Sequence, residues 1–139
     1  MKDTENKHLK MQEFVDCFAT TDFLSEMANL DNEKDRQAAA LKWLSLAALH
    51  GINEYAEKIS ISRSKKGHVK VTAEYREKDL PVMNSDVADT IFDTVREISH
   101  FDKSHGKTRM ALGVRDSSVD LNLELKEKSD KTKLTIRFV

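Results

Sequence analysis

The sequence predicts an α+β protein: an N-terminal helical pair followed by a β-β-α-β-β-β unit that forms an antiparallel sheet packed by helices. Apolar residues recur at a period near 3.6 over residues 8–51, and the period changes to two from residue 59 onward. One amphipathic helical stretch, residues 86–100, interrupts the alternating segments. Helices first and hairpins afterwards are typical of α+β folds with antiparallel sheets.

The helical part is predicted to span residues 8–51, after a polar start at 1–7 that we expect to be frayed. A first helical region is expected to break at "TTD", residues 20–22. The second helix contains "RQAAALKWLSLAALHG" and is apolar on all sides, which predicts the most buried helix of the protein. Gly51 is the expected residue just past its end, although helical spacing continues beyond it.

The sheet part is predicted over residues 59–139, within one domain of residues 1–139. Its alternating segments are "ISISR", "HVKVTAEYR", "TRMALGVRD", "SVDLNLELK" and "KLTIRFV". Their outward positions carry mixed charges and no aromatic residue, which indicates cross-strand ion pairs rather than stacking platforms for single-stranded nucleic acid. The last segment, at the end of the sequence, is a candidate for pairing across a sheet edge.

Charge is unevenly distributed along a chain whose formal net charge is −1. Residues 1–57 contain 6 basic and 11 acidic residues, a net charge of −5, whereas the remainder contains 17 and 13, a net charge of +4. Cys17 is the single cysteine, so an internal disulfide is excluded, and we interpret it as a small core residue. Without a membrane-length apolar segment or a signal-peptide core, the sequence predicts a cytoplasmic protein.

A row of acidic residues in the amphipathic helix is open to two interpretations. Asp93, Glu97 and His100 fall on one side of the helix, and carboxylates with a histidine can bind a divalent metal for catalysis. The same side lies opposite the apolar stripe, so these residues also fit the solvated face of a helix packed on a sheet. We favour the solvated face and keep the metal-dependent enzyme as an alternative.

Two basic turns are candidates for anion or nucleic-acid binding. Arg63, Lys65 and Lys66 surround one turn, and Lys107 and Arg109 follow another. If both turns reach the same end of the sheet, they form a cationic rim for phosphate groups. Lysines at hairpin tips also serve solubility, so this function stays an alternative.

Catalytic motifs give no positive signal. There is no G-x-S-x-G, no phosphate-binding glycine loop and no H-E-x-x-H in the chain. We therefore lean towards a protein without enzymatic activity and expect no cofactor.

The leading hypothesis is a non-catalytic protein–protein interaction or regulatory module, with itself or another protein as partner. Residues 1–50 contain more large apolar side chains than one covering helix needs, which favours a homodimer interface. The candidate interface residues are Phe14, Phe18, Phe23 and Trp43.

Overall fold

The computed structural model describes residues 2–74, 78–99, 106–114 and 117–138 and has the predicted α+β architecture. The first strand follows three helices, and a fourth helix separates the strands into two groups. A short 3-10 turn, η1, joins the second and third helices. The helices and the turn are α1 (Lys2–Phe18), α2 (Phe23–Ala28), η1 (Leu30–Asn32), α3 (Arg36–Asn53) and α4 (Ser85–Ser99).

The strands form one antiparallel sheet with the order β3-β2-β1-β6-β5-β4. β6 lies between β1 and β5, so our expectation that the last strand occupies an edge is wrong. Hydrogen bonds to neighbours on both sides use the backbone groups that an edge strand would offer to a partner. The strands are β1 (Lys58–Ser64), β2 (Val69–Glu74), β3 (Lys78–Asp79), β4 (Gly106–Val114), β5 (Ser117–Glu127) and β6 (Lys131–Phe138).

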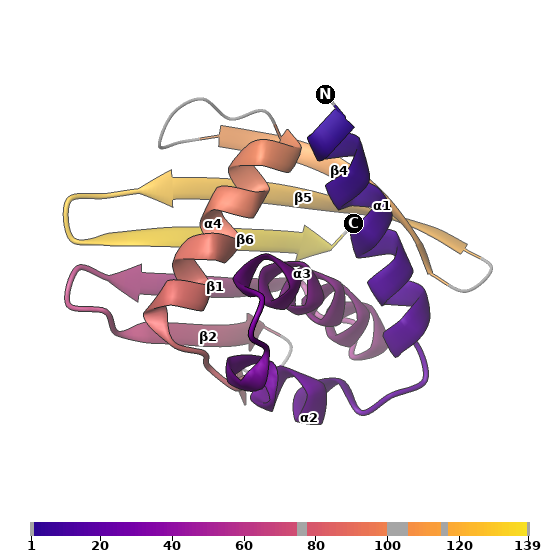
Figure 1. Ribbon diagram of the computed structural model, residues 1–139, viewed down its shortest axis with the longest axis horizontal. Coiled ribbons are helices and arrows are strands. Elements are labelled where there is room, and N and C mark those ends of the chain that lie inside the picture. Colours follow the sequence, from indigo (N-terminus) through magenta and orange to yellow (C-terminus); the bar gives the residue numbers. More distant parts are fainter. Residues whose placement is uncertain (1, 75–77, 100–105, 115–116, 139) are drawn as a thin grey trace.

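The molecule has two layers, because α1, α3 and α4 all lie over one face of the sheet (Figure 1). We call this the inner face and the opposite one the outer face. Within the described ranges, no helix covers the outer face (Figure 1). The first helices therefore pack on the sheet of their own chain, one of the two arrangements that the sequence allows.

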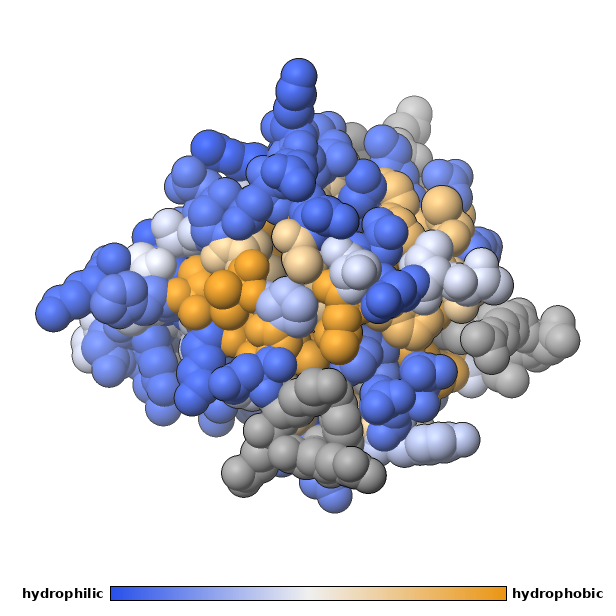
Figure 2. Space-filling model, turned by 90° about the horizontal axis from the view of Figure 1, so that it is seen from below, coloured by the Kyte–Doolittle hydropathy of each residue, from blue (hydrophilic) through white to orange (hydrophobic). Residues whose placement is uncertain are grey.

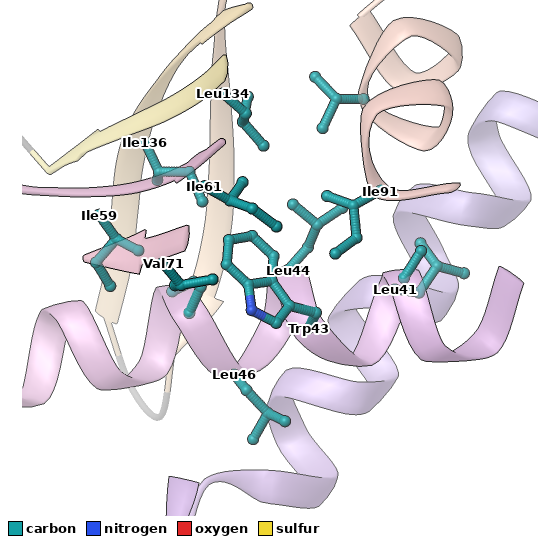
Figure 3. Close-up of a cluster of buried hydrophobic side chains, with 14 of the residues drawn as sticks. Leu41, Trp43, Leu44, Leu46, Ile59, Ile61, Val71, Ile91, Leu134 and Ile136 are labelled. Carbon is teal, nitrogen blue, oxygen red and sulfur yellow. The ribbon is translucent and has the colours of Figure 1, made fainter. Parts of the chain in front are cut away.

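The core fills the space between the layers (Figure 3). Trp43 of α3 is completely buried and lies among side chains of the sheet and α4, including Ile61 and Ile91 (Figure 3). Its indole Nε1 has no hydrogen-bond partner among the described residues, so the ring contributes packing only. Twelve of the eighteen residues of α3 are buried, as the apolar sequence of this helix predicts.

Local sequence signals explain several helix ends. The Asn84 side chain accepts a hydrogen bond from the Val87 amide at 3.0 Å and caps α4. The predicted break at residues 20–22 is present, and Asp22 caps α2. α1 begins at Lys2, so the backbone of residues 2–7, which we expected to be frayed, is helical.

Gly51 does not end its helix, because α3 continues to Asn53 and Tyr55 adopts the left-handed conformation with φ of 55°. A Cβ atom at position 51 would overlap the ring of Phe138. Glycine is needed there for the close approach of β6 to α3 rather than for a helix stop.

Cys17 is exposed, and our interpretation of it as a core residue is wrong. The buried side of α1 carries Met11 and Val15, which are one helical turn apart. Position 17 lies about 200° around the helix from position 15, on the opposite side. Cys17 therefore faces away from the side chains that α1 packs against α3.

The edge of strand β4 is partly covered by a side chain of α1. The Gln12 amide accepts a hydrogen bond from the Gly113 amide at 2.9 Å and donates one to its carbonyl at 2.6 Å. Both Gly113 groups thus find the partners that another strand would provide. This contact joins two segments 101 residues apart and reduces the exposed pairing edge of the sheet.

In the described ranges, none of the helices combines the length and the apolar character that crossing a membrane requires.

Candidate protein-interaction face

The acidic row of α4 forms ion pairs with arginines. Asp86 contacts Arg36 of α3 at 3.1 Å, and Asp89 contacts Arg63 of β1 at 3.0 Å. Asp93 contacts Arg96 at 2.8 Å. Two of these three carboxylates thus connect α4 to neighbouring elements of the fold.

The candidate metal site is only partly within the described ranges. Asp93 and Glu97 lie on the exposed side of α4, and His100 lies outside the described residues. Among the side chains that are described, no three histidine, cysteine, aspartate or glutamate residues come together as metal ligands do. Of this row, Asp86 and Asp89 form ion pairs with other elements, and Asp93 forms one within α4.

The four aromatic residues predicted for an interface lie at different depths. The rings of Phe14 and Phe18 stack with centroids 6.1 Å apart, and both side chains are half-buried. Phe23 of α2 is half-buried too. Trp43 has no exposed surface, so it offers nothing for a partner to touch and we assign it to the core.

An apolar patch surrounded by hydrophilic residues is visible from the side of α2 (Figure 2). Phe23 and Leu24 of α2 pack against the core and keep part of their surface exposed. Val82, in the segment before α4, is 53% exposed. A polar hollow of about 430 Å³ lies beside α2, between residues 19–24 and the end of α3.

The basic residues predicted for anion binding separate into two groups. The β1–β2 and β5–β6 turns lie side by side at one end of the sheet, where the Lys65 amide donates to the Asp130 carbonyl at 3.0 Å. The start of β4 reaches the same end, so the predicted convergence is present. However, Arg63 points to the inner side and pairs with Asp89, whereas Lys107 and Arg109 lie on the outer face.

The outer face gathers most of the remaining cations. Because side chains alternate along a strand, the register of the sheet assigns eight basic and four acidic described residues to this face. The basic residues are Lys58, Lys70, Lys107, Arg109, Lys126, Lys131, Lys133 and Arg137, and the acidic ones are Glu74, Asp79, Asp120 and Glu124.

The layer on the other side has the opposite charge. Residues 9–57 and 80–98, which include α2, α3 and most of α1 and α4, contain thirteen acidic and five basic residues. The molecule is thus acidic on its helical side and basic on its uncovered sheet, so the asymmetry seen along the sequence becomes one between two faces.

The register aligns the outer side chains in rows that run across the strands. The lysine row contains Lys70, Ser62, Lys133 and Lys126 from β2, β1, β6 and β5. The arginine row contains Glu74, Lys58, Arg137, Asn122 and Arg109 from β2, β1, β6, β5 and β4. The row between them contains Asp79, Thr72, Ser60, Thr135, Glu124 and Lys107 from β3, β2, β1, β6, β5 and β4.

Cations on this face are held close to one another. Lys126 and Lys133 are directly opposite across β5 and β6, an arrangement in which like charges repel. Partial burial lowers the pKa of Lys133, and the charges of Lys58, Lys131 and Lys128 lower it further. An acidic partner would relieve this repulsion.

Several acids on the outer face are already paired. Lys58 contacts Glu74 at 3.5 Å, and Glu124 contacts both Lys107 and Lys126 at 3.6 Å. The predicted cross-strand ion pairs are therefore present, but they leave an excess of positive charge. The alternation of the sequence identified most of these outward positions, and what it did not reveal was the strand order that groups them.

Comparisons with known proteins give no family for this chain: no protein-family model matches it, and a search of curated proteins finds no relative.

Proposed function

We propose that this protein is a non-catalytic interaction module that docks a protein partner rich in acidic side chains on its outer sheet face. The observation that carries the proposal is the combination of an uncovered sheet with eight cations against four acids. Uncovered faces with one dominant charge attract complementary surfaces and accelerate their association.

A protein partner fits this face better than a nucleic acid does. Glu74, Asp120 and Glu124 lie among the cations, where they would repel a phosphate backbone. The described outward positions of β1, β2, β4, β5 and β6 include no aromatic side chain on which a base could stack. A folded protein can match a mixed pattern of charges residue by residue.

The proposal can be tested with poly-L-glutamate as a model of an acidic partner. We expect binding, measured by isothermal titration calorimetry, that weakens steeply as salt is added. The variant Lys131→Glu with Lys133→Glu should lose this binding, because both positions lie on the outer face. The control Lys10→Glu with Lys34→Glu changes the net charge by the same amount at exposed positions of the helical side. This control should retain most of the poly-L-glutamate binding.

Two results would overturn this function. One is the absence of poly-L-glutamate binding even at low salt. The other is equal loss in the two double variants, which would show a response to net charge rather than to the outer face.

Nucleic-acid binding at the paired turns is a second candidate. The bond from Lys65 to Asp130 holds the two turns together, and Lys66 and Lys128 are exposed beside it. This candidate predicts salt-sensitive binding of duplex DNA that is lost when Lys65, Lys66 and Lys107 are neutralised. Tight duplex binding together with weak poly-L-glutamate binding would rank it above the protein-interaction module.

We further propose that the protein is cytoplasmic and forms a homodimer through Phe14, Phe18 and Phe23, which the fold leaves partly exposed. Native mass spectrometry of the wild type and of Phe18→Asp should show a dimer that the substitution disrupts while the circular dichroism spectrum is kept. A monomeric wild type would contradict this assembly. The same spectrum reports any metal bound by Asp93, Glu97 and His100.

A further inference from the structure

The end of the β5–β6 hairpin concentrates lysines on the outer face. The sequence KEKSDKTK, residues 126–133, contains four lysines within eight residues. Lys126 of β5 and Lys133 of β6 lie directly opposite each other, and Lys131 lies two residues before Lys133 on the same face. Lys128 follows the end of β5, and its amide donates a hydrogen bond to the Lys131 carbonyl at 2.7 Å. The turn therefore holds these lysines close together.

Lys133 is the lysine of this cluster that lies inside the sheet. It has strand neighbours on both sides, Ser62 of β1 and Lys126 of β5. Its side chain is half-buried, whereas Lys126 and Lys128 are exposed. A lysine that is partly removed from water, or that lies beside another cation, loses its proton more readily, and the uncharged amine is the nucleophile. The position of Lys133 thus favours the reactive form of its side chain.

The charges around Lys133 act mainly in one direction. Partial burial lowers its pKa, and three neighbouring cations lower this pKa further: Lys58, Lys131 and Lys128. Glu74 acts in the opposite direction, but its carboxylate pairs with Lys58 at 3.5 Å. At neutral pH, the uncharged fraction of Lys133 is therefore larger than that of a lysine with the usual pKa.

Two of the neighbouring lysines can attract an anionic reagent. In the part of the chain that the structure describes, Lys128 and Lys131 form no ion pair with a carboxylate. Ammonium groups bind phosphate oxygens through charge-assisted hydrogen bonds. In an acyl phosphate, one oxygen atom joins the phosphate to the electrophilic carbonyl carbon. A donor whose phosphate is held by these two lysines would therefore have its carbonyl close to the amine of Lys133.

We propose that Lys133 is a site of acylation by acyl phosphates, with Lys128 and Lys131 binding the phosphate of the donor. The uncharged amine attacks the carbonyl carbon, a C–N bond forms, and the bond between this carbon and the bridging oxygen breaks. The bridging oxygen leaves with the electron pair as part of inorganic phosphate, which takes the proton that the nitrogen loses. The products are a neutral amide on Lys133 and hydrogen phosphate.

The acylation goes beyond the proposed function and does not depend on it, because it concerns the reactivity of one amine rather than the binding of a partner. Its consequence for the outer face is the loss of one cation. Where this face binds an acidic partner, acylation of Lys133 would weaken that binding.

The experiment incubates the protein with acetyl phosphate at neutral pH and follows acetylation by mass spectrometry. Cleavage after glutamate releases residues 128–139, in which tandem spectra locate the modified lysine. Acetylation should be about tenfold faster at Lys133 than at the exposed Lys10, because a cationic cluster raises the local concentration of an anionic reagent by about tenfold or more. With p-nitrophenyl acetate, an uncharged donor of the same acyl group, the preference for Lys133 should be smaller.

Two double variants test the role of the neighbouring cations. Lys128→Gln with Lys131→Gln should slow the acetylation of Lys133 by acetyl phosphate about tenfold, since it removes the two groups that attract the donor. The control Lys34→Gln with Arg36→Gln removes the same charge from exposed positions of the helical side and should keep most of the rate. Circular dichroism verifies that each variant is folded.

Three results would overturn the acylation site. Acetylation of Lys133 that is no faster than that of Lys10 would show that its position gives it no special reactivity. Equal preference for Lys133 with both donors, or equal loss in the two double variants, would show that Lys128 and Lys131 do not bind the phosphate. Faster acetylation of Lys128 or Lys131 would place the reactive amine in the turn instead.

Discussion

The two faces of the sheet differ in burial and in charge. On β1, Ile59 and Ile61 are completely buried against the helices, whereas Ser60 and Ser62 between them point to the uncovered side. The same backbone thus presents an apolar layer that holds the fold together and a charged layer that the core does not need. Substitutions on the first should act on stability, and substitutions on the second should act mainly on binding.

The largest effect is expected at the centre of the inner side. Trp43→Ala should lower the free energy of unfolding by about 3–5 kcal/mol, because it leaves a cavity between α3 and the sheet. Trp43→Phe should cost clearly less, since the indole Nε1 has no hydrogen bond among the described residues to lose. Urea unfolding of both variants measures the difference, and equal costs would contradict the view that Trp43 acts through packing alone.

A matched pair on one strand tests the comparison directly. Ile61→Ala should lower the free energy of unfolding by about 2–5 kcal/mol through loss of buried contacts. Ser62→Ala, one residue further along β1 and on the outer face, should change it by no more than about 0.5 kcal/mol. If Ser62→Ala were as destabilising as Ile61→Ala, the outer face would have a structural role. The distinction between an inner face that stabilises the fold and an outer face that binds a partner would then be wrong.

Alkaline titration should reveal the lowered pKa of Lys133, which partial burial and then the neighbouring cations produce. Because the pKa of Lys133 is lowered in the folded protein, the unfolded chain binds more protons in the interval from that folded pKa up to 10.5. The contribution of Lys133 to stability is therefore lowest at neutral pH and increases as the pH rises through this interval.

The variant Lys133→Met isolates this contribution. The difference in free energy of unfolding between wild type and variant should shift in favour of the wild type as the pH rises towards 10.5. Chemical denaturation at several pH values measures it. A difference that does not depend on pH would mean that neither partial burial nor the neighbouring cations lower the pKa of Lys133.

The smallest effect is expected in the acidic row of α4. Asp86→Asn removes the ion pair with Arg36. The side chain of Arg36 is 63% exposed and that of Asp86 is 59% exposed. Exposed ion pairs contribute about 0–1 kcal/mol to stability. We therefore expect Asp86→Asn to lower the free energy of unfolding by an amount near the lower end of this range. High salt should abolish this difference. A loss well above this range would indicate that the row has a role beyond surface ion pairing.

The fold could be predicted from the sequence wherever the pattern is local. The change of period near residue 59 located the sheet, and the amphipathic stretch at residues 86–100 located α4. Distant contacts left no such signal: Gly51 resembled a helix stop because nothing in the sequence shows Phe138 packed against it. The edge position expected for β6 failed for the same reason, since pairing between distant strands sets the strand order.

The candidate site, too, depends on contacts between distant segments that leave no local signal in the sequence. Alternation placed Lys133, Thr135 and Arg137 on one side of their strand, and β1 and β5 became their neighbours only in the folded sheet. The cationic outer face arises from alignment across strands and has no sequence motif. Trp43 was predicted as an interface residue, and only the structure shows that it is completely buried, whereas Phe14 and Phe18 keep part of their surface exposed.

The most direct test of the outer face is an amide chemical-shift titration of the ¹⁵N-labelled protein with poly-L-glutamate. Our account predicts changes concentrated at Ser60, Lys133 and Thr135, with α1 and α3 unaffected. Changes confined to the turns at Lys65 and Asp130, or to the region of Phe14 and Phe18, would contradict it and place the interaction elsewhere on the molecule.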